Sequence, residues 1–99
     1  MAETAFTRPI LYIKPGCPWC REAKAFFDRH GIAVDLRDVN ANPRDMQRMV
    51  EISGQSLTPT LEHGEFVVAD FSVDELLDEL AEQPEIRRDL GIADHLEDE

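Results

Sequence analysis

Apolar residues along the chain follow the two spacings that distinguish strands from helices. Residues 10–13 form a continuous apolar run, which is typical of a buried strand. Residues 18–30 then carry apolar side chains at the spacing of one helix face, and residues 33–39 alternate as in a second strand, with Val34 and Leu36 on one face. Because strand, helix and strand fit within about 30 residues, the pattern predicts a parallel βαβ unit.

The second half of the chain predicts different elements. Asn42 and Pro43 fit the first positions of a helix that runs to about Ser53 and buries Met46, Met49 and Val50. Residues 60–63 and 66–69 are short apolar stretches separated by Gly64-Glu65, a spacing that favours a hairpin. We therefore expect an antiparallel addition to the sheet.

Two further helices are indicated near the C-terminal end. Ser72 and Glu75 fit a capping box, and Phe71 and Leu76 fit the hydrophobic staple that accompanies one. Pro84 suits the start of a last short helix. The order predicts an α/β fold, a four-stranded mixed sheet flanked by helices on both faces. We expect a single domain over residues 1–99, with a core of about 9–90 and loose segments at 1–8 and 92–99.

Charge is distributed unevenly over the 99 residues. Residues 1–69 carry nine acidic and eight basic side chains, whereas residues 70–99 carry twelve acidic and two basic ones, and the net charge is −11. A solvated acidic helix face with an acidic tail explains this pattern, and so does a surface that steers basic partners. Either interpretation argues against nucleic-acid binding. Residues 1–9 lack the features of a secretion signal and no apolar run is long enough to span a membrane, so we expect a cytoplasmic protein, and a monomer.

Residues 14–20, Lys-Pro-Gly-Cys-Pro-Trp-Cys, carry the candidate chemistry. With Pro18 at the first helical position, Cys17 becomes the N-cap, where free backbone N–H groups and the helix dipole favour thiolate over thiol. Lys14 adds a positive charge nearby. Cys20 follows three residues later, on the same helix face, with an expected Cα separation of roughly 5–6 Å that permits a disulfide. The spacing predicts an accessible sulfur and a more buried one that together form a reversible dithiol/disulfide switch.

Two other interpretations of the cysteine pair stay open. A structural disulfide would close so short a loop that it would stabilise the fold weakly. A zinc site would need four ligands, and the chain has no second cysteine pair, while His30, His63 and His95 lie far apart in sequence. In a reducing compartment a pair at this spacing is more often redox-active than structural. We expect no metal here.

The residues also resemble a known family. Residues 14–20, followed by Asp38-Val39-Asn40 and by the stretch Ser53 to Thr60, resemble a glutaredoxin within the thioredoxin fold, and the resemblance spans residues 10 to about 80. It implies that Cys17 is the nucleophile and Cys20 the resolving thiol. It also implies that Pro59 is cis and packs beside the dithiol, with the Thr58 backbone bonding a bound thiol peptide. Without the resemblance, the sequence is equally consistent with Pro59 as an ordinary proline at the end of a loop, because few such bonds are cis.

The same resemblance assigns a glutathione site. Lys14 would meet a carboxylate of glutathione, and Trp19 would form a wall of the groove, although core packing is the alternative for Trp19. The stretch containing Asp70 and Phe71 corresponds to the place where glutaredoxins hold the γ-glutamyl carboxylate. Asp70 would repel that carboxylate, unless it turns away and leaves the helix end at Ser72 to bind the anion. This departure resembles the glutaredoxin-like redoxins reduced by thioredoxin reductase.

These observations predict an enzyme, a dithiol thiol-disulfide oxidoreductase that acts as an electron carrier in cell redox homeostasis. Its partners would be disulfide-containing proteins, or glutathione mixed disulfides, with glutathione as co-substrate. One alternative replaces glutathione by thioredoxin reductase as the electron donor. Another, of a different class, is an iron–sulfur carrier in which Cys17 from two chains and two glutathione thiols would supply the ligands.

Overall fold

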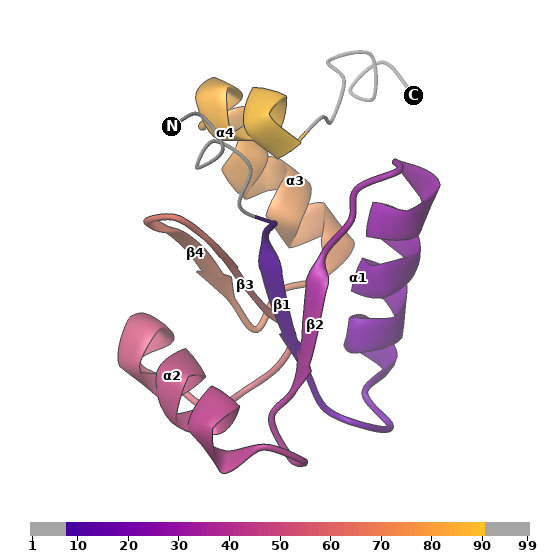
Figure 1. Cartoon of the computed structure of the whole chain (residues 1–99). Helices are drawn as coiled ribbons and strands as arrows, with labels where there is room; N and C mark the ends of the chain where they lie inside the picture. Colours follow the sequence, from indigo (N-terminus) through magenta and orange to yellow (C-terminus); the bar gives the residue numbers. More distant parts are fainter. Residues whose placement is uncertain (1–7, 91–99) are drawn as a thin grey trace.

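The computed structural model describes residues 8–90 (Figure 1). The chain forms β1 (Ile10–Ile13), α1 (Pro18–Arg29), β2 (Asp35–Asp38), α2 (Pro43–Ser53), β3 (Thr60–His63), β4 (Phe66–Ala69), α3 (Val73–Ala81) and α4 (Pro84–Leu90). The order of strands and helices is the one that the apolar pattern predicts.

The four strands of the described region form one mixed sheet in the order β2-β1-β3-β4. β1 pairs in parallel with β2, and the βαβ unit is confirmed. β3 pairs antiparallel with both β1 and β4, so the predicted hairpin is confirmed as well. This order places β1 and β3 in the centre, and the loops that follow β1 and precede β3 therefore emerge side by side at one end of the sheet.

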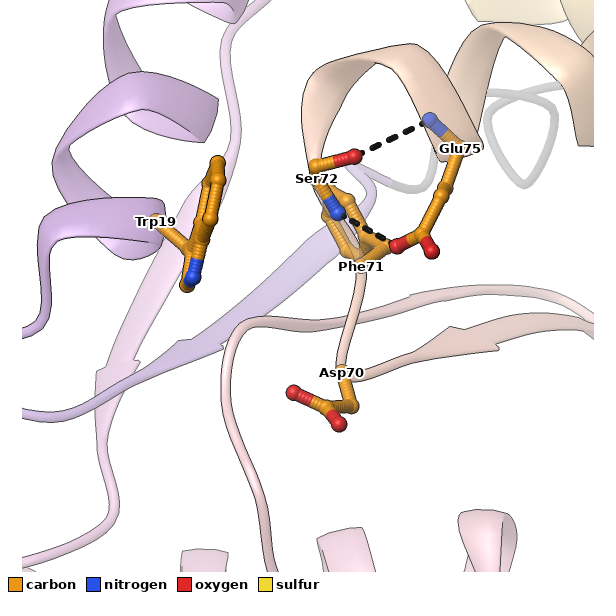
Figure 2. Close-up of a pocket in the computed structure, with 5 residues that line it drawn as sticks. All are labelled: Trp19, Asp70, Phe71, Ser72 and Glu75. Carbon is orange, nitrogen blue, oxygen red and sulfur yellow. Dashed lines mark hydrogen bonds between the residues drawn. The ribbon is translucent and has the colours of Figure 1, made fainter.

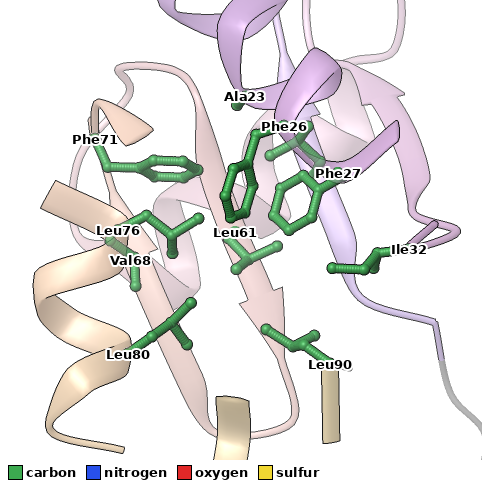
Figure 3. Packing of buried hydrophobic residues seen from close by; sticks show 11 residues of the cluster. Ala23, Phe26, Phe27, Ile32, Leu61, Val68, Phe71, Leu76, Leu80 and Leu90 are labelled. Carbon is green, nitrogen blue, oxygen red and sulfur yellow. The ribbon is translucent and has the colours of Figure 1, made fainter. Parts of the chain in front are cut away.

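Helices cover both faces of the sheet, as expected. The larger cluster of buried side chains joins α1, α3 and α4 to one face of the sheet, and Figure 3 shows Phe26 and Phe27 meeting the leucines of the opposite helices. The smaller cluster joins α2 to the other face through Tyr12, Val39 and Met49. The sheet and its helices thus form three layers, and of the helices in residues 8–90 only α2 packs on the second face of the sheet.

Two helices begin as the sequence predicts. Asn42 caps α2, since its side chain accepts a hydrogen bond from the backbone N–H of Arg44. Ser72 caps α3 in a complete capping box with Glu75. Phe71 and Leu76, the predicted staple, are both buried in the larger cluster. Gly54 ends α2 with φ of 74°, a left-handed conformation that glycine adopts without steric cost.

Two expectations for this region need correction, the extent of the second strand and the burial of Val50. The second strand covers Asp35–Asp38 rather than residues 33–39. Leu36 is 38% exposed because β2 is an edge strand with a neighbour on one side only. Val50 is 40% exposed rather than buried, because the inner stripe of α2 runs through Met46, Met49 and Ile52, three residues apart, and leaves Val50 on its flank.

Other expectations fall outside the described residues. The loose segments predicted at 1–8 and 92–99 lie, apart from residue 8, in the parts of the chain that the structure does not describe. Among residues 8–90, no helix combines the length and the apolar composition that crossing a bilayer requires.

Candidate functional site

Cys17 lies at the junction of β1 and α1, where the sequence places it. It is the N-cap of α1, with φ of −94° and ψ of 110°, and the backbone N–H of Cys20 donates to its sulfur at 3.1 Å. Pro18 occupies the first turn. The Cys17 sulfur therefore lies against the positive end of the helix, an environment that stabilises negative charge on sulfur.

Cys20 completes the pair from within the first turn of α1. The two cysteines are joined as a disulfide, and their Cα atoms are 5.1 Å apart. Cys20 is only 4% exposed, whereas Cys17 is partly accessible. Attack from solution is thus directed at Cys17, while Cys20 is positioned to react with its neighbour.

The loop before β3 brings a second segment to the sulfur. The Thr58-Pro59 peptide bond is cis, as the resemblance implies. The Thr58 hydroxyl donates to the Cys17 sulfur over 3.7 Å, and the Thr58 carbonyl oxygen lies 3.8 Å from the same sulfur. A residue forty-one positions away along the chain therefore contacts the candidate nucleophile directly.

Side chains that the sequence analysis did not single out hold this loop. The Gln55 amide donates to Ser53 at 2.9 Å and to the Thr60 hydroxyl at 3.2 Å, and its oxygen accepts from the backbone N–H of Leu57 at 2.6 Å. The Thr60 hydroxyl donates in turn to the Leu57 carbonyl at 2.9 Å. Glutamine in a polar loop has no distinctive spacing, so only the three-dimensional contacts identify its role.

Two large apolar side chains are exposed beside the cysteines. Trp19, between the two cysteines, and Leu57, directly before Thr58, are each 52% exposed. Core packing, the alternative considered for Trp19, is therefore wrong. Exposed apolar surface on both sides of Cys17 is a feature of surfaces that receive another molecule.

Lys14 contacts the same loop rather than a charged group. Its ammonium donates to the Ser56 carbonyl oxygen at 2.9 Å. This hydrogen bond joins the segment after β1 to the segment before β3, so that Lys14 helps to fix the loop carrying Leu57 and Thr58. The ammonium keeps further donors with which it can meet an anion.

A pocket of about 330 Å³ lies beside the dithiol and is lined by Trp19, Asp70, Phe71, Ser72 and Glu75. Figure 2 shows Trp19 on one side and the other four residues opposite. Asp70 is exposed and has a φ of 55°, a left-handed conformation that aspartate tolerates better than most residues. Phe71 is 2% exposed and anchors the segment in the core.

Backbone donors in the pocket wall already have partners. The N–H groups of Asp70 and Phe71 donate to the carbonyl oxygen of Pro59, at 2.8 and 3.4 Å. Within the capping box, Ser72 N–H donates to Glu75 Oε1 at 2.9 Å, and Glu75 N–H donates to Ser72 Oγ at 3.2 Å. The N–H of Ser72, which the sequence analysis offers to an anion, is therefore already bonded to a carboxylate of the chain itself, that of Glu75.

A polar network around the buried side chains of Tyr12 and Glu62 joins the sheet to α2, and the sequence analysis missed it. Tyr12 on β1 donates to Glu62 Oε1 on β3 at 2.7 Å, and Arg48 on α2 donates to Glu62 Oε2 at 2.7 Å. Burial raises the pKa of Tyr12, and its hydrogen bond to Glu62 raises it further. Burial alone would raise the pKa of Glu62 too, but hydrogen bonds from Arg48 and Tyr12 hold it below its usual value.

An acidic residue within a strand is the signal that could have revealed this network. Glu62 interrupts the apolar pattern of β3, yet it is only 9% exposed. A carboxylate that is buried in this way needs hydrogen-bonding partners. Within residues 8–90, no three His, Cys, Asp or Glu side chains gather in a way that could hold a metal ion.

Comparisons with known proteins agree with this geometry. The sequence profile of the Glutaredoxin family matches residues 10–67, more than half of the chain. The glutaredoxin of Neisseria meningitidis is 33% identical over 63 residues, which cover 63% of this chain and 74% of that protein. Glutaredoxin 3 of Escherichia coli is 28% identical over 51 residues, 52% of this chain and 61% of that protein. The match to this last relative spans about three fifths of its length.

Solved structures extend the likeness over more of the chain. The solution structure of glutaredoxin from Brucella melitensis is 30% identical and superposes with a TM-score of 0.63, covering 88% of this chain and 91% of that one. The strand order, the helix placement and the paired cysteines are thus accompanied by similarity in sequence. The chain belongs to the glutaredoxin family and has its thioredoxin-like fold.

Proposed function

We propose that this chain is a dithiol thiol-disulfide oxidoreductase, an enzyme of the glutaredoxin type that reduces disulfides in proteins or with glutathione. The Cys17 thiolate attacks one sulfur of the substrate disulfide, forms a mixed disulfide and releases the other substrate sulfur as a thiolate. Cys20 then loses its proton and attacks the Cys17 sulfur, which frees the second substrate thiolate. Two electrons pass from the dithiol to the substrate, and the released thiolates take protons from water.

The observation that carries this proposal is the position of Cys17 at the start of α1. Its partly accessible sulfur receives hydrogen bonds from Cys20 N–H and from the Thr58 hydroxyl, and the buried Cys20 sulfur lies within bonding reach. Both donors stabilise the thiolate, which is the attacking species and also the leaving group when the mixed disulfide resolves. A purely structural disulfide would need none of this access.

Substitution of each cysteine tests the mechanism. We expect Cys17→Ser to abolish reduction of a peptide disulfide by the reduced protein. Cys20→Ser should retain the first attack and accumulate a mixed disulfide, visible by mass spectrometry as the chain plus one substrate half. Full activity of the Cys17→Ser protein, or a mixed disulfide on Cys20 in the wild type with none on Cys17, would exclude the proposal.

Two electron donors are candidates for reducing the Cys17–Cys20 disulfide. The glutaredoxin family generally uses glutathione, and thioredoxin reductase with NADPH is the alternative for this chain. Oxidised protein can be incubated with each system, after which the free thiols are counted. Release of two thiols by glutathione supports the first donor, and release by thioredoxin reductase alone supports the second.

The same proposal includes a cytoplasmic location, a monomeric state and a single domain with its core at about residues 9–90.

The alternative of an iron–sulfur carrier would require Cys17 to bind a cluster instead of pairing with Cys20, whereas the two cysteines are paired within one chain here. A dithiol catalyst therefore fits the contacts of Cys17 better.

A further inference from the structure

The pocket beside the dithiol is unsuited to an anionic ligand. Four backbone N–H groups of its wall are engaged: two with the Pro59 carbonyl and two within the capping box. A substrate carboxylate that entered would have to displace the Glu75 carboxylate from the Ser72 N–H. The positive end of α3 is thus partly neutralised by the chain's own side chain.

The charges on the pocket wall also favour a cation. Of the five side chains that line it, Asp70 and Glu75 carry carboxylates and none is basic. Glu75 uses Oε1 in the capping box, which leaves Oε2 for a ligand. Lys14, the basic residue that the sequence analysis assigned to a ligand carboxylate, does not line this pocket and donates to the Ser56 carbonyl oxygen instead.

The remaining wall suits the stem of a basic side chain. Trp19 is half-exposed and faces Phe71, Ser72 and Glu75 across the pocket (Figure 2). An indole face binds the methylene stem and the charged head of lysine or arginine, while carboxylates opposite accept its hydrogen bonds. The pocket therefore combines the two components of a site for a basic side chain.

The pocket also lies close to the reacting sulfur. Trp19 stands between the two cysteines in sequence, and the backbone of Asp70 and Phe71 bonds Pro59, the neighbour of Thr58. Thr58 in turn contacts the Cys17 sulfur. A residue next to a cysteine that is attacked by Cys17 can thus reach the pocket.

We infer that this pocket selects disulfides whose reacting cysteine is flanked by lysine or arginine, and disfavours disulfides with carboxylates nearby, glutathione disulfide included. The inference rests on the proposed dithiol exchange and names its substrate class. The chemical steps are unchanged, because the pocket acts on encounter and binding of the substrate.

Blocked tripeptide disulfides, each a symmetric dimer, provide the test. In the three peptides, the cysteine is flanked on both sides by lysine, by glutamine or by glutamate. Glutathione disulfide is the fourth probe. The full-length protein is reduced with dithiothreitol, desalted and mixed with each probe, and formation of the Cys17–Cys20 disulfide is followed by acid quench and mass spectrometry. At low salt we expect the lysine probe to react about tenfold faster than the glutamate probe, with glutamine between them. Added salt should reduce this ratio.

Variants that remove charge without changing shape identify the source of the selectivity. Asparagine tolerates the left-handed backbone of residue 70, and glutamine preserves the capping box at residue 75. Asp70→Asn with Glu75→Gln should lower the lysine-to-glutamate rate ratio from about tenfold to about twofold. Asp78→Asn removes one negative charge from α3 outside the pocket and should leave the ratio unchanged.

The outcomes separate the two levels of the argument. Equal rates for all the peptide probes, or a ratio that Asp78→Asn lowers as much as the double variant does, would overturn the pocket's selectivity while leaving dithiol exchange intact. Glutathione disulfide reacting as fast as the lysine probe would overturn it as well. If the wild type reduced none of the four probes, the proposed function itself would fail.

Discussion

At the scale of single residues, Cys17 depends on one contact that its own segment does not provide. The hydroxyl of Thr58 donates to its sulfur over 3.7 Å, in addition to the helix N–H at 3.1 Å. The first bond is long, so its contribution to thiolate stability is modest, whereas the second is built into the N-cap position. Thr58 thus adjusts a sulfur that α1 already activates.

Thr58→Val tests that adjustment, since valine keeps the shape and removes the donor. We expect the thiolate fraction of Cys17 at neutral pH to fall about threefold, the loss of a weak hydrogen bond. The measurement is the pH dependence of thiolate absorbance in a Cys20→Ser background. Thr58→Ser keeps a hydroxyl and serves as the control. A Thr58→Val curve that overlies that of the control would show that the contact has no effect.

Candidate residues differed in how well sequence could place them. Cys17 and Cys20 follow local rules, an N-cap with proline after it and a three-residue spacing, and their positions were predicted in detail. The contact with Thr58 depends on the sheet order, which sets β3 beside β1, and required the family resemblance. Gln55 carries no local signal, and Glu62 within β3 indicates only that partners are needed and not which residues supply them, so the loop contacts and the Glu62 network were missed.

At the scale of elements, the Glu62 network ties α2 to the centre of the sheet. Its three members come from β1, β3 and α2, and the glutamate is the shared acceptor. α2 leads directly into the loop that carries Thr58 and Pro59. The network therefore stabilises the segment from which the second half of the candidate site is built.

The lowered pKa of Glu62 predicts how stability depends on pH. The unfolded chain, in which the carboxyl titrates near 4.5, binds its proton at a higher pH than the folded chain does. The stabilisation is therefore complete above that value and is lost as pH falls through the lower folded value. We expect the unfolding free energy of the wild type, from urea titration, to decrease as the solution is acidified from about pH 5 to pH 3.

Glu62→Gln isolates this contribution from that of other carboxyls. We expect it to lower the unfolding free energy by about 1–3 kcal/mol at neutral pH, because the paired charge is lost and Arg48 and Tyr12 are less well satisfied. The difference from wild type should shrink in acid. Arg48→Gln is the milder control, since the Arg48 side chain is 54% exposed and solvent screens its ion pair. A constant difference across the pH range would contradict the account.

Most elements could be predicted from periodicity and capping, and the failures have physical causes. Strand and helix order followed from apolar spacing, and the Ser72 capping box from four residues. The exposure of Leu36 depends on β2 being an edge strand, and the exposure of Val50 depends on how much of the surface of α2 packs against the sheet. Both are set by the tertiary structure and not by the local sequence.

At the scale of the whole molecule, the acidic segment of the chain lies beside the candidate site. The acidic excess of the sequence begins at Asp70 and continues through α3, beside the pocket that Trp19 completes. Approach of basic polypeptides is favoured over this side, and approach of small anions is disfavoured. The fold supplies the reactive sulfur, and the charge pattern supplies selection among disulfides.

The claim on which everything depends is that folding itself makes Cys17 reactive. The most direct measurement is the pH dependence of iodoacetamide alkylation of the reduced protein, mapped to each cysteine by mass spectrometry, in buffer and in concentrated urea. In the folded protein, we predict a midpoint for Cys17 at least about one pH unit below the value near 8.5 of a free thiol, with Cys20 protected, and equal behaviour of both in urea. A Cys17 midpoint that is the same in buffer and in urea, or faster alkylation of Cys20 than of Cys17 in the folded protein, would contradict the account.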